Sequence, residues 1–320
     1  MTTFGDMVNM LGGVPVAGGL GDVALAGGNW YFCDPTHGTA NADGTTPQTA
    51  NSNLKTVYDK CRDGYNDGVI FMGGATAWNP SAMLTWSKSY THLIGTSGQL
   101  GVGNRCRIVA QAATALAAVV TFSGDGCLIK NIQINNEKAA GAASGVAIIT
   151  GQRCIFENVF FMVPTATDAA SYSCKLSGGE NAFIRCTFGQ HTIVRTAASY
   201  GLWVHLGAGD NQRNKFIGCD FLSWSSTTDH VLVKIATDLT TDTFTMFFED
   251  CTFCNLISGA GTLTAAFVDG ATDAGHRIVM KGKGNTIVGC TAVANPLTYV
   301  YTAEVGGTQS GLLATAINES

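Results

Sequence analysis

A short apolar segment that carries Asn or Cys near its end recurs along the chain from about residue 105 onward. The copies are Leu128–Ile132, Ile155–Val159, Phe183–Thr187, Phe216–Asp220, Phe248–Thr252 and Ile287–Thr291. A second short strand precedes the copies, as Val146–Ile149 does, so one unit is two strands and a loop of variable length. Helical periodicity is absent from these units, which excludes helical repeat arrays. Each unit is also too short for the four strands of a propeller blade.

This repeat predicts an all-β fold, a right-handed parallel β-helix in which each coil adds one rung about 4.8 Å above the last. Equivalent residues then stack in ladders along the solenoid. The predicted anchor ladder is Asn131, Asn158, Cys186, Cys219, Cys251 and Cys290, and the predicted phenylalanine ladder is Phe160, Phe188, Phe221 and Phe253. Small Cys and stacked Asn suit an inward corner, because an Asn amide can bond its neighbours above and below.

One short helix is predicted before the repeat begins, over residues 52–63. Four apolar residues recur there at helical spacing and form a single stripe: Leu54, Val57, Tyr58 and Cys61. Ser52 or Asn51 can cap the start of this helix, and Gly64 can end it. A solenoid exposes strand edges at its ends, which invite edge-to-edge pairing. We therefore expect this helix to cap the first coil.

The repeat divides the chain into four parts. Residues 1–29 form a Gly-rich N-terminal extended arm, and residues 30–67 hold an opening strand, a turn-rich loop and the capping helix. Residues 68–294 form the parallel β-helix, and residues 295–320 form an extended C-terminal capping or contact segment. The arm cannot form a helix, so its scattered apolar residues need a surface to pack on. The candidate partner contacts in the two terminal segments are Phe4, Met7, Leu11, Val14, Pro15, Val16, Leu20, Leu312 and Leu313.

Composition narrows the classes of partner. Apolar residues make up 46% of the chain and charged residues 13%, a balance that excludes a mostly disordered chain. The net charge is −5 and no run of Lys or Arg occurs, so we expect no nucleic-acid partner. No segment reaches the ~18 consecutive apolar residues of a membrane span, so we expect no membrane insertion.

The cysteines indicate a protein made in a cytosol. The chain has 11 Cys, and its N-terminus lacks the basic segment of a secretory signal. An odd number of Cys without such a signal predicts reduced, buried thiols. The one close pair, Cys251 and Cys254, has no second pair to complete a zinc site. We expect no metal and no cofactor.

The segment Trp30–Gly38, followed by Asn41–Ala50, resembles the opening motif of many parallel β-helix proteins. In those proteins an aromatic strand ending in Asp-Pro leads to an Asn-Asp-Gly turn and a short capping helix. The motif recurs in pectate-lyase-like enzymes and in phage tail-spike and virion proteins. The Gly-rich start, with Phe4–Asp6 and Leu11–Pro15, is similar to the openings of tailed-phage structural proteins. The resemblance implies a pectate-lyase-like β-helix in a virion, assembled in the host cytoplasm and commonly trimeric.

Within that resemblance we favour a non-enzymatic structural protein that decorates or cements the phage capsid. A homotrimer would bind the major capsid protein or other virion proteins through its terminal segments. The N-terminal arm is short enough to lie along other subunits, and there is neither a long head-binding domain nor a coiled-coil stem. A charged fraction of 13% also suits a protein that its neighbours cover.

The alternative class is a phage tail spike that binds a cell-surface glycan or cleaves a polysaccharide, as a glycoside hydrolase or a polysaccharide lyase. A hydrolase needs two carboxylates roughly 5–9.5 Å apart. Asp220 and Asp250 fall on adjacent predicted rungs and make the best such pair, with Glu249 beside them. Trp203 or Trp224 would then be the sugar platform. Two solvated acids on a polar face explain the same pattern without catalysis, and a cellular adhesin or scaffold is a third class.

A further set of charges is predicted to stack without forming a site. Lys130, Glu157 and Arg185 occupy one position of the repeat on consecutive rungs, with alternating sign. The two basic residues neutralise Glu157, so this ladder does not resemble a calcium cluster. We expect a surface charge ladder in which each pair contributes under about 1 kcal/mol.

Overall fold

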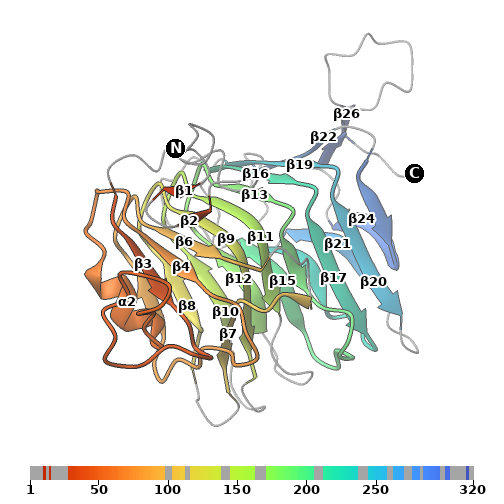
Figure 1. The fold of residues 1–320 in the computed structure, drawn as a ribbon. Coiled ribbons are helices and arrows are strands. Elements are labelled where there is room, and N and C mark those ends of the chain that lie inside the picture. The colour runs from red at the N-terminus through yellow and green to blue at the C-terminus, as the bar shows by residue number, and fades with distance from the viewer. Residues whose placement is uncertain are drawn as a thin grey trace.

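The chain coils into a parallel β-solenoid, as Figure 1 shows. The computed structural model describes residues 10–11, 14–15, 28–97, 103–111, 116–137, 145–162, 171–204, 212–236, 244–257, 262–269, 276–281, 284–295, 300–302 and 315–316. The predicted all-β, right-handed parallel β-helix is confirmed. No helix among the described residues is long and apolar enough to cross a membrane.

Two large sheets form the three walls of the solenoid, and the eight-stranded sheet is one of these walls. The eight-stranded sheet contains β5 (Leu84–Trp86), β8 (Val120–Phe122), β10 (Gly145–Ile149), β12 (Ser171–Leu176), β15 (Ser199–Val204), β18 (Val231–Ile235), β21 (Leu263–Asp269) and β24 (Cys290–Asn295). These strands pair in parallel and include the second strand predicted for each unit.

The larger sheet folds around a corner and supplies the other two walls. It contains β3 (Trp30–Cys33), β4 (Gly68–Phe71), β6 (His92–Gly95), β7 (Arg107–Ala110), β9 (Leu128–Asn136), β11 (Ile155–Met162), β13 (Ala182–Ile184), β14 (Thr187–Gly189), β16 (Gln212–Ile217), β17 (Asp220–Ser225), β19 (Phe244–Glu249), β20 (Thr252–Ile257), β22 (His276–Lys281), β23 (Thr286–Val288), β25 (Val300–Thr302) and β26 (Thr315–Ala316). β9 and β11 run through the corner, whereas later rungs are split there into two strands.

The corner is made by residues in the left-handed backbone conformation. Asn131 and Asn158 share it, with φ of 58° and 52°. Nδ2 of Asn158 donates to Oδ1 of Asn131 at 2.8 Å, and Nδ2 of Asn131 donates to the carbonyl oxygen of Gly95 at 3.3 Å. This is the amide ladder expected of stacked Asn. The amides tie successive rungs together at a point where strand pairing is interrupted.

The predicted anchor ladder is wrong from its third member onward. Strand pairing puts Phe160 beside Thr187 and Phe161 beside Phe188, so Arg185 follows Asn158 at the corner. Arg185, Gly218 and Asp250 all have positive φ, at 52°, 58° and 54°. The corner selects the left-handed backbone conformation, which Asn, Gly and Asp tolerate well, and does not select one residue type, since Arg185 adopts it too.

The cysteines form a different ladder, one residue after the corner. Cys186, Cys219 and Cys251 point inward and are fully buried. Each Sγ lies near a backbone carbonyl oxygen of an earlier rung: Phe156 at 3.2 Å, Phe183 at 3.3 Å and Phe216 at 3.5 Å respectively. Small thiols therefore fill the narrow angle inside the corner and bond across rungs.

The last predicted copy of the repeat is also misplaced. Thr286 pairs with Thr252, so Asn285 takes the position opposite Cys251, and its Oδ1 accepts the Cys251 N–H at 2.9 Å. Cys290 instead begins β24 and pairs with Leu263 in the eight-stranded sheet. Because Ile287–Thr291 spans the turn between two walls, its likeness to the earlier copies does not reflect an equivalent position.

Two parallel stacks of phenylalanine fill the interior. One contains Phe161, Phe188, Phe221 and Phe253, with ring centroids 5.2, 4.9 and 4.7 Å apart. The predicted ladder therefore begins at Phe161 and not at Phe160. The other contains Phe156, Phe183, Phe216 and Phe248, at 5.0, 4.7 and 4.7 Å. Rings of the two stacks meet edge to face, so the core is a continuous aromatic column.

The predicted helix is α2 (Leu54–Lys60), at the N-terminal end of the solenoid in Figure 1. All four residues of its apolar stripe are buried. Tyr58 stacks on Trp86 with ring centroids 4.1 Å apart. The N-cap is Asn53, whose side chain accepts from two N–H groups of the first turn, and not Ser52 or Asn51. The helix ends at Lys60 with Cys61 as its C-cap, before Gly64 is reached.

The terminal segments contribute short antiparallel pairs. In the arm, β1 (Met10–Leu11) pairs with β2 (Val14–Pro15). Near the C-terminus, β26 lies antiparallel to β25. Leu11, Val14 and Pro15 thus belong to a backbone pairing. The other predicted partner contacts lie outside the described residues: Phe4, Met7, Val16, Leu20, Leu312 and Leu313.

Candidate functional site

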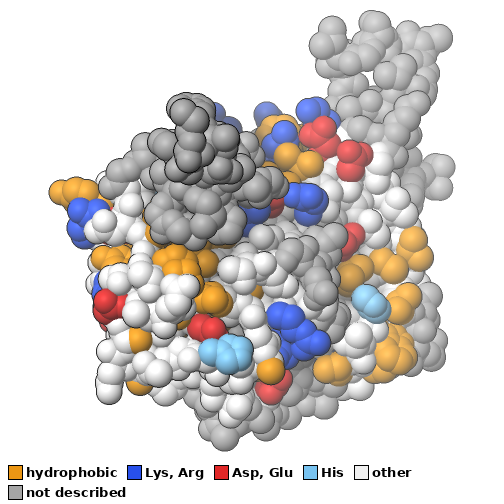
Figure 2. All heavy atoms as spheres, in the orientation of Figure 1, with side chains coloured by type: hydrophobic (Ala, Val, Ile, Leu, Met, Phe, Trp, Pro, Cys, Tyr) orange, Lys and Arg blue, Asp and Glu red, His pale blue; other side chains and the backbone are white. Residues whose placement is uncertain are grey.

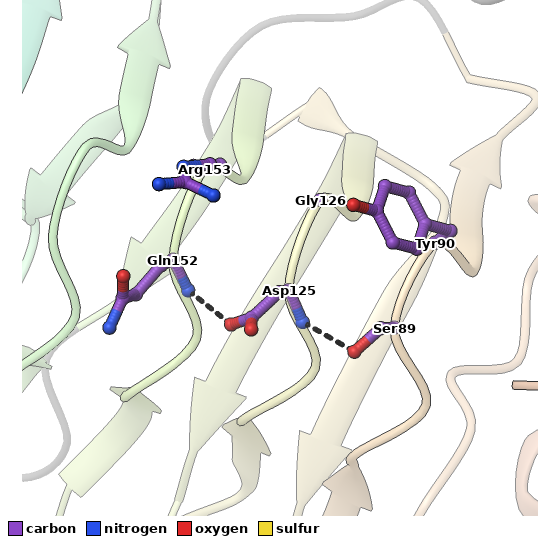
Figure 3. Close-up of a pocket in the computed structure, with 6 residues that line it drawn as sticks. All are labelled: Ser89, Tyr90, Asp125, Gly126, Gln152 and Arg153. Atoms are coloured by element: carbon purple, nitrogen blue, oxygen red, sulfur yellow. Dashed lines mark hydrogen bonds between the residues drawn. The ribbon is translucent and has the colours of Figure 1, made fainter. Parts of the chain in front are cut away.

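A groove of about 370 Å³ lies on the outside of the solenoid, along the turns that lead from the eight-stranded sheet into the larger one (Figure 3). Three successive turns line it, each with two residues: Ser89 and Tyr90, Asp125 and Gly126, and Gln152 and Arg153. The turns leave β5, β8 and β10 and enter β6, β9 and β11. The solenoid repeat therefore sets side chains from three rungs side by side.

The backbone of these turns is held rigidly. Tyr90, Gly126 and Arg153 are all left-handed, with φ of 51°, 63° and 56°, so the three turns have one shape. Oδ1 of Asp125 accepts the Gln152 N–H at 2.8 Å, and Oγ of Ser89 accepts the Asp125 N–H at 3.1 Å. Both bonds cross from one turn to the next, as Figure 3 shows. The groove is thus pre-formed by the stacking of rungs.

An exposed aromatic ring forms one side of the groove. Tyr90 is 52% exposed although its backbone is in a conformation that bulky residues rarely adopt. A Cβ on Gly126 would lie 2.8 Å from Cε1 of Tyr90, so the ring lies against the Gly126 backbone. Glycine at this position makes room for the ring and gives it a fixed support.

The charges beside the ring are balanced. Nε of Arg153 donates to Oε2 of Glu180 at 2.7 Å, and Arg213 bonds the other oxygen of Glu180. Hydrogen bonds from Arg153 and then Arg213 lower the pKa of Glu180, and the bond to Glu180 raises the pKa of Arg153. The Arg153 side chain is still 74% exposed, so it can also meet a ligand. With the exposed Asp125, the groove offers an acceptor and a donor beside an aromatic face.

The charge triplet at Glu180 is one of three on the described rungs. Glu157 lies between Lys130, at 2.7 Å, and Arg185, and Glu249 lies between Lys215 at 3.6 Å and Lys281 at 3.5 Å. In each triplet a glutamate is held by cations from the rung before and the rung after. We call these three groups the glutamate clamps.

The clamp at Glu157 is the charge ladder predicted from the sequence, and its Arg185 side chain, 60% exposed, lies at the surface as expected, whereas the other two members are more enclosed. The Lys130 and Glu157 side chains are only 12% and 13% exposed. Water screens a pair so enclosed less than it screens a surface pair, so the surface value of under about 1 kcal/mol does not describe it. The clamp ties three rungs on the outside of the corner, where the amide ladder ends.

The residues of the alternative catalytic prediction are distributed over different ladders. Glu249 belongs to a clamp. Asp220 pairs with Thr252 after the corner, whereas Asp250 is itself the corner residue opposite Gly218. The prediction that Asp220 and Asp250 share a face assumed unbroken strand alternation, which a left-handed residue interrupts. Oδ1 of Asp250 instead lies over Gly284, 2.0 Å from where a Cβ would be.

Asp220 lies half-buried at the start of β17. Burial raises the pKa of its carboxyl group, and a hydrogen bond from Thr252 and the nearby His191 oppose this in part. A half-buried carboxyl group that holds its proton more tightly is what a general acid needs. The catalytic assignment of Asp220, Asp250 and Glu249 stays a prediction.

Trp203, one of the two predicted sugar platforms, has two tyrosines and a lysine beside it. It lies on β15 of the eight-stranded sheet, with Tyr172 and Tyr200 each 5.5 Å away between ring centroids. Nζ of Lys175 lies 4.6 Å from the centre of the Trp203 ring. Trp224 lies on β17, in the other sheet. The two tryptophans therefore belong to different walls.

Sequence reasoning missed the groove. None of the six residues that line the groove is among the site residues predicted from the sequence. No residue type could have revealed it, because Tyr90, Gly126 and Arg153 share only a left-handed backbone conformation. Within the described part of the chain, no group of three or more His, Cys, Asp and Glu is placed to hold a metal ion.

The solenoid is similar in fold to enzymes that act on pectin. Pectin methylesterase PemA from Erwinia chrysanthemi matches with a TM-score of 0.51 and 12% identity, over 85% of this chain and 80% of that one. Pectate lyase Pel9A matches with a TM-score of 0.50 and 13% identity, over 88% of this chain and 77% of that one. These likenesses show the fold alone.

A phage protein is a more distant match. ORF18 of Geobacillus virus E2 has a TM-score of 0.39 and 12% identity, over 78% of this chain and 57% of that one, and a likeness at this level supports no conclusion about function. No protein-family model matches the chain, and its sequence matches no curated protein. The expected pectate-lyase-like β-helix is therefore established as a fold, while function has to be argued from the residues.

Proposed function

We propose that this chain is a non-enzymatic structural protein of a tailed-phage virion, assembled in the host cytoplasm, which decorates or cements the capsid as a homotrimer. The observation that carries the structural part is the set of glutamate clamps. Each central glutamate is engaged by cations of the rungs before and after it, so its charge ties neighbouring rungs of the solenoid together. With the aromatic column inside, the solenoid is built as a rigid body.

The phage part of the proposal is supported by the sequence. The opening motif and the Gly-rich arm resemble those of tailed-phage structural proteins. In this proposal residues 1–29 and 295–320 bind the major capsid protein or other virion proteins. The contacts would be the apolar residues of these segments, Phe4, Met7, Leu11, Val14, Pro15, Val16, Leu20, Leu312 and Leu313.

Cryo-electron microscopy of the intact particle that carries this chain tests the proposal directly. We expect trimeric density on the capsid lattice, with residues 1–29 ordered against shell subunits. A variant that starts at residue 28 should leave the solenoid folded and be absent from the lattice. Density at the tail alone, or no density on a virion, would contradict the decoration role.

A second candidate function, a polysaccharide-cleaving spike, is favoured by the raised pKa of Asp220. If Asp220 is the general acid, Asp220→Asn should reduce depolymerisation of host surface polysaccharide at least about 100-fold, as loss of a general acid does. The measurement is the release of reducing ends from purified polysaccharide. Light scattering checks that the variant keeps the oligomeric state of the wild type. The matched control is Asp229→Asn, an exposed aspartate of the same region. Equal activity of wild type and Asp220→Asn removes Asp220 from consideration.

A further inference from the structure

We infer that the groove between the turns at Tyr90, Asp125 and Arg153 binds a neutral pyranose unit of a glycan, by stacking on the tyrosine and by hydrogen bonds to the two charged groups. This inference does not depend on where the chain is located or on whether it decorates a capsid. Its stacking ring and its acceptor, Tyr90 and Asp125, have no part in the virion proposal or in the Asp220 proposal, whereas Arg153 also belongs to the clamp at Glu180.

The aromatic ring is the first reason. A sugar has one largely apolar ring face, and an exposed aromatic side chain held flat can stack on it. Tyr90 is 52% exposed and its ring lies against the Gly126 backbone, so the turn supports the ring while about half of the residue stays open to a ligand. Its left-handed φ of 51° is costly for a large side chain. Strained conformations of this kind cluster at binding sites, where the surroundings over-determine them.

The polar groups are the second reason. Oδ1 of Asp125 is engaged by the Gln152 N–H, which fixes the carboxylate plane and leaves acceptor capacity for hydroxyl groups. Nε of Arg153 is engaged by Glu180, which fixes the guanidinium group in the same way. A carboxylate acceptor and a guanidinium donor that are both oriented by the protein can bind neighbouring hydroxyls of one sugar ring.

The charge balance selects a neutral ligand. Asp125 and Glu180 supply two negative charges, and Arg153 and Arg213 supply two positive ones. A uronic acid would add a third negative charge to a set that the two arginines already balance. The volume of the groove also suits a ligand as small as one sugar unit, since about 370 Å³ falls at the lower end of the usual range for small-ligand sites.

Saturation-transfer NMR on the full chain tests this inference. The probes are the methyl α-glycosides of glucose, galactose and mannose, with sodium galacturonate as the anionic comparison. We expect transfer to the ring protons of at least one neutral glycoside, with a Kd at least tenfold lower than that of galacturonate. Tyr90→Ala should weaken this binding at least tenfold, and Tyr90→Phe should keep it within about threefold because the ring remains.

The matched control is Tyr65→Ala. Tyr65 is 57% exposed, on the turn before the Tyr90 rung, but it does not line the groove. The Tyr65→Ala variant should bind the glycoside as the wild type does. Asp125→Asn should weaken binding about tenfold, as expected for loss of a charge-assisted hydrogen bond. The inference is overturned if no neutral glycoside shows transfer, or if the signal survives in Tyr90→Ala with an unchanged thermal transition.

Discussion

Phe216→Ala is expected to lower the free energy of unfolding by about 3–5 kcal/mol, the usual cost of deleting a buried phenylalanine ring. Phe216 is fully buried between Phe183 and Phe248, each with its ring centroid 4.7 Å away. It also meets Phe188 and Phe221 edge to face, so the vacated space has aromatic walls on several sides. Planar stacks from separate rungs cannot close such a space without shifting the rungs themselves.

Urea denaturation of the purified chain measures this effect, with hydrogen exchange to locate it. Because each rung of a solenoid contacts only its neighbours, amide protection should fall most in β13, β16 and β19 and least in β3 and β4. Leu256→Ala is the control, since Leu256 is 45% exposed on β20 and its truncation should cost less than about 0.5 kcal/mol. A loss below about 1 kcal/mol for Phe216→Ala would show that the stacks are loosely packed.

The second large effect is a loss of stability in mild acid that originates at His92. Burial lowers the pKa of His92 from 6.5 to about 4. Its Nδ1 accepts the Leu128 N–H at 3.1 Å, which requires the neutral ring, and its plane stacks on Trp30. Between pH 6.5 and pH 4, His92 binds a proton in the unfolded chain but stays neutral in the folded chain. The free energy of unfolding should therefore fall from pH 6.5 toward pH 4 and level off below.

The expected size is about 2–3 kcal/mol between pH 7 and pH 4.5, from the cited pKa values and 1.36 kcal/mol per unit. His92→Asn keeps an acceptor for the Leu128 N–H but does not titrate. Over the same pH interval, the free energy of unfolding of this variant should therefore fall about 2–3 kcal/mol less than that of the wild type. His230, whose pKa burial lowers to about 3, acts in the same direction and is present in both proteins. Parallel pH curves for wild type and His92→Asn would contradict the assignment.

Much of the fold could be predicted because a recurring short apolar segment without helical periodicity leaves few architectures open. The helix stripe at Leu54, Val57 and Tyr58 was equally informative, since a single face of apolar residues must be buried. Its N-cap was misassigned because Asn51, Ser52 and Asn53 are all capping residue types. Only the structure shows that Asn51 accepts the Asn53 N–H at 2.8 Å, which leaves Asn53 to cap the helix.

Register at the corner could not be predicted from residue type. Cys186 resembles the anchor Asn158 only in being followed two residues later by a phenylalanine. The constraint at the corner is a positive φ, and Arg185 meets it without a residue-type signal. The resulting slip of one residue moved Phe160 into a ladder that Phe161 occupies. The groove was missed for the same reason, since Tyr90, Gly126 and Arg153 have only their backbone conformation in common.

The buried thiols at the corner give the molecule an internal set of reporters. Burial holds the pKa of Cys219 well above its ordinary value, and contact with Cys219 together with burial does the same for Cys251. Only the thiolate reacts with an alkylating reagent, so a thiol that is buried in a closed rung does not react. Each modification therefore records one opening of one rung. The rates at Cys186, Cys219 and Cys251 would map, coil by coil, how often this column comes apart in its native state.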